Sequence, residues 1–98
     1  MSIDRGLLAI LEAKPGKGDE LAAFLKQGRE LAAAEPGTVT WYAFKLGDTT
    51  YGIFDTFGDE ESRQAHLNGQ IPAALGQVAD DLLAKEPDIR STDIIAVK

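Results

Sequence analysis

The sequence has 98 residues, of which 44% are hydrophobic and 27% charged, and its formal net charge at pH 7 is -6. This length suits a single domain, residues 1–98, and the apolar fraction is that of a globular fold rather than a disordered chain. Nucleic acids and anionic membranes are bound first through Lys and Arg, so an acidic chain without a basic cluster excludes both as expected partners. The absence of cysteine excludes disulfides, thiolate metal sites and a cysteine nucleophile.

The first part of the chain predicts a strand followed by a helix. Residues 6–13 are mostly apolar and end at Lys14-Pro15-Gly16, which predicts a strand and a turn. The run is too short to span a membrane and contains Glu12, so we expect a cytoplasmic protein. From Asp19 to about Ala34, apolar residues recur at helical spacing, and Glu35-Pro36-Gly37 ends this predicted helix.

The middle of the chain predicts two strands joined by a hairpin loop. Residues 38–44 and 50–57 are rich in β-branched and aromatic side chains. Residues 46–49, with the sequence Leu-Gly-Asp-Thr, form the expected loop between them. These two strands are predicted to be neighbours in an antiparallel sheet.

The last part of the chain predicts a helix in two pieces and a final strand. Asp59 is a suitable N-cap for a short helix over residues 60–67, and a second, amphipathic helix follows with Pro72 in its first turn. The apolar run Ile94–Val97 predicts the last strand. The order β-α-β-β-α-β, with the second helix split, is the ferredoxin-like α+β arrangement, a split βαβ fold with an antiparallel sheet.

The predicted strands place large apolar side chains on both faces of the sheet, as at Leu7 and Leu8 or Ile53 and Phe54. Helices cover only one face of a ferredoxin-like sheet, so the other face needs a ligand or a second copy of the chain. We expect a homodimer formed through this sheet face. The alternative is that some of these residues lie at strand ends under loops. A charged residue at Ile53 or Ile95 would weaken either the core or the interface and so assign the faces.

Four segments together resemble the antibiotic biosynthesis monooxygenase family. They are the PGKGDEL stretch after the first strand, the Glu35-Pro36-Gly37 turn, residues 53–59 followed by Ala65-His66, and residues 93–97. The resemblance implies a dimeric α/β barrel, in which two sheets pack face to face, and a pocket in each subunit between sheet and helices. Each turn taken alone is also explained by the fold.

The family resemblance implies several activities. Members include cofactor-independent monooxygenases of polycyclic phenols and quinols, haem-degrading enzymes and an isomerase of a signal molecule. Many relatives have a tryptophan where this chain has Phe57, and haem degraders use an asparagine on the first strand. The one asparagine of this chain is Asn68, outside any predicted strand, so haem degradation is not expected.

His66 is the single histidine and the first candidate catalytic residue. Imidazole transfers protons near neutral pH, and the position matches a frequent helix histidine of the family. We expect it at the mouth of a pocket between the sheet and the helices. The alternative is a surface or capping histidine at the end of a short helix. One histidine cannot assemble a metal site, so no metal is predicted.

Aromatic side chains on the two middle strands are the candidate substrate-binding residues. Such a cluster suits a flat apolar or aromatic molecule, although each ring alone is as well explained as core or dimer packing. Asp55 interrupts an apolar strand, where a carboxylate needs a partner or water. It is either an acid/base or ligand-orienting group, or half of an ion pair. The candidates are Trp41, Tyr42, Tyr51, Phe54, Asp55 and Phe57.

The leading function is a cofactor-independent monooxygenase acting on a small hydroxylated aromatic or quinol, as the resemblance implies. No cofactor is expected, because an ionised dihydroxy-aromatic can itself donate an electron to dioxygen while the protein supplies deprotonation and a dry pocket. One alternative is a non-catalytic protein that binds a small apolar molecule in the same pocket. Another is an isomerase of a small carbonyl compound.

Overall fold

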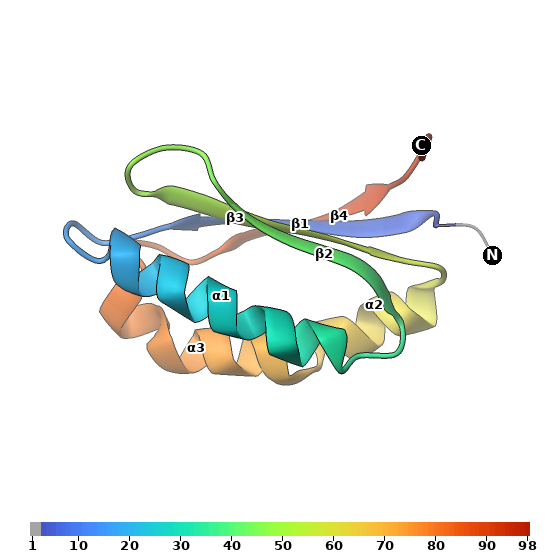
Figure 1. Ribbon diagram of the computed structural model, residues 1–98, viewed down its shortest axis with the longest axis horizontal. Coiled ribbons are helices and arrows are strands. Elements are labelled where there is room, and N and C mark those ends of the chain that lie inside the picture. Colours follow the sequence, from blue (N-terminus) through green and yellow to red (C-terminus); the bar gives the residue numbers. More distant parts are fainter. Residues whose placement is uncertain (1–2) are drawn as a thin grey trace.

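The computed structural model describes residues 3–98, which form one antiparallel sheet and three helices. In chain order the elements are β1 (Arg5–Glu12), α1 (Gly18–Ala33), β2 (Thr38–Lys45), β3 (Thr50–Phe57), α2 (Glu60–Leu67), α3 (Gln70–Leu82) and β4 (Asp88–Asp93). The strand order is β2-β3-β1-β4, and all three helices lie on the same side of the sheet (Figure 1). The predicted α+β, ferredoxin-like fold is confirmed.

Local sequence signals explain where the helices begin and end. The Asp59 carboxylate accepts a hydrogen bond from the backbone N–H of Ser62 at 2.8 Å, so it caps α2 as predicted. Gly69 separates α2 from α3, and Pro72 occupies the first turn of α3. Gly16 has a φ of 78°, which glycine adopts without the Cβ penalty, and so allows the tight turn from β1 into α1. None of the helices in residues 3–98 is both long enough and apolar enough to span a bilayer.

The predicted position of the last strand, Ile94–Val97, was wrong. β4 is the polar segment Asp88–Asp93, paired antiparallel with β1 from Ile10↔Asp88 to Arg5↔Asp93. The backbone N–H of Ile94 still donates to the Asp4 carbonyl oxygen at 3.0 Å. Because β1 begins at Arg5, the residues after Ile94 have no strand beside them and continue past the sheet. β4 is an edge strand, and polar residues are common on edges because they discourage pairing with other chains.

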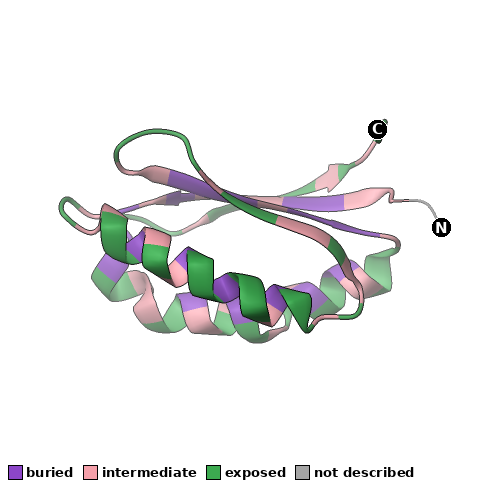
Figure 2. Ribbon diagram, in the orientation of Figure 1, coloured by how far each residue is buried: buried purple, intermediate pink, exposed green. Residues whose placement is uncertain are grey.

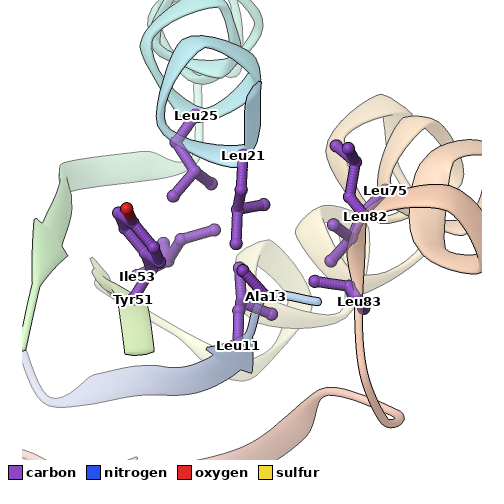
Figure 3. Packing of buried hydrophobic residues seen from close by; sticks show 9 residues of the cluster. All are labelled: Leu11, Ala13, Leu21, Leu25, Tyr51, Ile53, Leu75, Leu82 and Leu83. Atoms are coloured by element: carbon purple, nitrogen blue, oxygen red, sulfur yellow. The ribbon is translucent and has the colours of Figure 1, made fainter. Parts of the chain in front are cut away.

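Alternate residues of the two central strands face the helices and form the core. Ile53 and Tyr51 on β3 pack with Leu11 on β1 against α1 and α3. Purple, buried positions accordingly line the inner side of each helix in Figure 2. The buried cluster, shown in Figure 3, comprises Leu11, Ala13, Leu21, Leu25, Tyr51, Ile53, Leu75, Leu82 and Leu83.

The opposite face of the sheet is not covered by helices and is apolar at its centre, with Asp88 and Arg90 of β4 at its edge. Leu8, Ile10 and Phe54 alternate with the core residues of their strands, so their side chains point away from the helices. All three are only partly buried within residues 3–98 of the single chain. The prediction of apolar side chains on both faces is confirmed, and Ile53 is assigned to the helix-covered face. Ile95 belongs to neither face of the sheet and is 97% exposed.

We expect Leu21→Ala to destabilise the fold by about 2–5 kcal/mol, because the side chain is completely buried and its loss leaves a cavity. Leu46→Ala is the matched control, since Leu46 is 63% exposed in the hairpin loop and should change stability by about 0.5 kcal/mol or less. Urea unfolding measures both. Equal effects of the two substitutions would contradict this assignment of the core.

Candidate functional site

His66 lies between two carboxylates that come from different parts of the chain. Its Nε2 is 2.9 Å from Oδ2 of Asp55 on β3, and its Nδ1 is 2.6 Å from Oε1 of Glu35. Glu35 belongs to the turn between α1 and β2. His66 is 5% exposed and Asp55 1% exposed, so both belong to the interior, and the Glu35 side chain is half-buried beside them. We call these three residues the buried triad.

Local structure fixes each member of the buried triad. Asp55 shares the helix-facing side of β3 with the core residues, two positions after Ile53. Glu35 is held by the Thr38 hydroxyl, which donates to its Oε1 at 2.7 Å. Arg63 lies one turn before His66 on α2 and donates to the backbone oxygens of Gly6 at 3.3 Å and Thr92 at 3.2 Å. These two bonds fasten α2 to the sheet.

The two carboxylates determine the protonation of His66. Burial lowers the pKa of an imidazole, but here the hydrogen bonds and negative charges of Asp55 and Glu35 outweigh it and raise the pKa from 6.5 to about 9. At neutral pH the ring is therefore an imidazolium with an N–H directed to each carboxylate. This charged donor, rather than a free base, is what the site contains.

A narrow cavity of about 50 Å³ adjoins Asp55 and His66. The other residues around it are apolar and come from β1, β3, α2, α3 and β4: Leu7, Ala9, Ile53, Leu67, Ile71, Pro72, Leu75 and Ile89. Among residues 3–98, Oδ1 of Asp55 is buried and has no hydrogen-bond partner. A carboxylate oxygen in this state is unfavourable until a donor reaches it.

The far side of His66 borders a second hollow, of about 240 Å³, between the Glu35–Thr38 turn and α2. The ring of Phe57 lies beside His66, with 5.4 Å between the ring centroids. His66 thus separates an internal apolar cavity from a more polar hollow. His66 was expected at the mouth of a pocket between the sheet and the helices; it lines the cavity between these layers, but it is buried rather than at an exposed rim.

The candidate substrate-binding residues do not form one site. Asp55 and Phe57 lie at the buried triad. Trp41, Tyr42 and Tyr51 instead line a cleft of about 440 Å³ between α1 and β2. Phe54 points to the uncovered face of the sheet.

Two residues of the site were missed by the sequence reasoning. Glu35 was read only as part of a helix-ending turn, and Arg63 only as part of α2. The sequence did contain a signal for Arg63. It lies three positions before His66, and residues three apart on a helix share a face. For Glu35 no local signal exists, since its partner is 31 residues away. No group of three or more potential metal ligands in residues 3–98 is arranged to hold a metal ion.

Solved structures show what this chain is similar to. A protein of unknown function from Nitrosomonas europaea is 49% identical, with a TM-score of 0.96, and the match covers 98% of this chain and 93% of that one. A candidate antibiotic biosynthesis monooxygenase from Caulobacter crescentus is 20% identical over 96% of this chain and 92% of its own, with a TM-score of 0.80. The chain has the antibiotic biosynthesis monooxygenase fold. By its identity over nearly the full length, it belongs to the same family as the Nitrosomonas protein.

A further candidate antibiotic biosynthesis monooxygenase, from Chloroflexus aurantiacus, supports the same fold. It is 22% identical over 97% of this chain and 96% of its own, with a TM-score of 0.75. No family model and no curated protein matches the sequence. The two structural matches to candidate antibiotic biosynthesis monooxygenases confirm the resemblance at the level of the fold.

The raised pKa of His66 predicts how stability depends on pH. The imidazolium is favoured in the folded protein, so its contribution is complete below the unfolded pKa of 6.5 and is lost as the pH rises through about 9. Between these values we expect the free energy of unfolding to fall by on the order of 3 kcal/mol more in the native protein than in His66→Gln. Urea unfolding at a series of pH values measures this difference. Parallel pH profiles of the two proteins would show that the imidazolium is not stabilised by the fold.

Proposed function

We propose that this protein is a cofactor-independent monooxygenase of a small hydroxylated aromatic compound or quinol, and that the reaction takes place at the cavity beside Asp55. The observation that carries the proposal is the buried, unpartnered Oδ1 of Asp55, a residue that lines the cavity together with His66 and apolar side chains. A substrate hydroxyl supplies the missing donor and brings an apolar ring with it. The candidate monooxygenases that share the fold support the same choice.

In the proposed reaction, Asp55 accepts the proton of the substrate hydroxyl. His66 orients this carboxylate, because its Nε2 lies 2.9 Å from Oδ2 and leaves Oδ1 for the substrate. The ionised quinol transfers electrons to dioxygen. A quinol plus dioxygen gives a hydroxyquinone plus water, so all four electrons come from the quinol and no other reductant is needed. The apolar wall keeps other water from the reacting oxygen species.

The size of the cavity determines how a substrate fits. About 50 Å³ is enough for a hydroxyl group and its immediate neighbours but less than the 300–1,000 Å³ typical of pockets that enclose a whole small molecule. Ile89 on the edge strand β4 lines the cavity and is 49% exposed, so the cavity opens at this edge. We expect the ring to enter between α3 and β4 while the Ile89 side chain moves outward.

We expect Asp55→Asn to lower oxygen consumption with an accepted quinol by about 100-fold or more, because an amide cannot take the proton. Asp48→Asn, a change of the same kind in the exposed hairpin loop, should leave the rate unchanged. An oxygen electrode and a panel of quinols measure both. If quinols bind but no oxygen is consumed, the protein is better explained as a binding protein. If it instead catalyses proton exchange at the carbon next to the carbonyl of a small carbonyl compound, the isomerase is favoured.

We also propose that two copies of the chain associate through the uncovered face of the sheet. Leu8, Ile10 and Phe54 make this face apolar, and a second copy would bury it in the same way on both subunits. Such a dimer closes the two sheets into the α/β barrel that the sequence resemblance implies.

We expect Phe54→Glu to convert the dimer into a folded monomer, because the new charge lies in the interface and outside the helix-covered core. Leu46→Glu, at an exposed position in the hairpin loop, is the matched control and should remain dimeric. Sedimentation velocity at micromolar concentration measures the mass, and circular dichroism verifies folding. A native protein that sediments as a monomer would refute this association.

A further inference from the structure

A second cleft lies apart from the buried triad, between α1 and β2. Its volume of about 440 Å³ falls in the range of small-molecule sites, and it shares no lining residue with the cavity beside Asp55. The proposed reaction makes no use of it. The cleft therefore needs its own explanation.

Aromatic and small apolar groups form the floor of this cleft. Trp41 and Tyr51 lie on the helix-facing side of β2 and β3, and Ala22 and Leu25 of α1 lie opposite them. The Trp41 ring lies over Gly28 of α1. The indole Nε1 of Trp41 is buried and has no hydrogen-bond acceptor among residues 3–98. A buried indole N–H is normally bonded, so Trp41, which lines the cleft, has an unused donor.

The polar lining of the cleft is positively charged. Lys26, Arg29 and Lys45 surround it, and no carboxylate lines it, although the chain as a whole has 16 acidic and 10 basic residues. Lys26 and Arg29 lie one turn apart on α1, and Lys45 Nζ is 5.8 Å from the centre of the Tyr51 ring. Arg29 also pairs with Glu30 at 3.0 Å, but both are exposed and such a pair is weak.

We propose that this cleft is a binding site for a small aromatic carboxylate. The ring of the ligand packs against Trp41 and Tyr51, and its carboxylate is bound by the Lys26 and Arg29 cations, with the indole N–H as a further donor. A neutral ligand packs against the aromatic walls but forms no ion pair with Lys26 or Arg29. The site is independent of the monooxygenase reaction, which depends on Asp55.

The single tryptophan of the chain reports directly on this site. We would titrate the protein with 3-phenylpropionate and with its neutral amide, 3-phenylpropionamide, and follow Trp41 fluorescence and the one indole N–H signal in a nitrogen-proton NMR spectrum. We expect saturable binding of the carboxylate, at least about fivefold tighter than the amide, with a shift of the indole signal. Salt at 0.5 M should reduce the difference in affinity between the carboxylate and the amide, because exposed cations are screened.

Charge variants test whether the cations select the ligand. The double variant Lys26→Gln/Arg29→Gln should lose about fivefold or more in affinity for 3-phenylpropionate and none for the amide. Lys85→Gln, which removes an exposed lysine outside the cleft, is the control and should bind like the native protein. The proposal is overturned if the acid and the amide bind equally, if neither moves the indole signal, or if the double variant binds the acid as well as the control. Oxygen consumption is not used in any of these measurements.

Discussion

A carboxylate on the central strand β3, with 1% of its surface exposed, determines much of this structure. Transfer of Asp55 from water into the core is unfavourable unless a positive charge or several donors accompany it. His66 supplies that charge at 2.9 Å, and Glu35 supports the same imidazolium from the other side. One ring therefore joins the sheet, α2 and the turn after α1. Arg63, bonded to the ends of β1 and β4, fixes the same helix against the sheet.

The same arrangement changes the role first expected of histidine. An imidazole with a pKa near 7 exchanges protons freely, but one with a pKa of about 9 holds its proton at neutral pH. Both ring nitrogens of His66 already face carboxylates. The group with unused capacity for a proton is Oδ1 of Asp55. The proposed chemistry accordingly begins at the carboxylate, and the histidine acts by holding that carboxylate in place.

Most of the fold could be predicted from the sequence because local signals coincide with tertiary needs. Capping by Asp59, Pro72 in a first helical turn and the β-branched and aromatic run of β3 each agree with the final arrangement. β4 could not be predicted, because an edge strand paired only with β1 needs no apolar pattern, whereas the apolar Ile94–Val97 run lies beyond the end of β1. Its place is set by the register with β1, which is a property of the whole sheet.

The site was predictable in part for the same reason. Asp55 and His66 were visible as chemically unusual residues in an apolar strand and a short helix. Their pairing with Glu35 was not, because the contact spans 31 residues and the Glu35-Pro36-Gly37 turn is fully explained by its local role. Alternation along a strand separates two faces, but it cannot show that Trp41 and Asp55, which lie on the same face, line different hollows.

The charges around these two hollows imply that they select different ligands. With His66 protonated, the buried triad has two carboxylates and one cation, so its net charge is -1 and an anionic ligand would be repelled from the Asp55 cavity. A neutral hydroxyl group meets no such repulsion and finds an acceptor. The cleft at Trp41 has the opposite sign, because cations line it and carboxylates do not. Trp41 lies directly across from Asp55 in the β2–β3 register. In these two proposals, one face of the sheet carries a hydroxyl acceptor and an anion-attracting cleft on neighbouring strands. The two hollows share no lining residue.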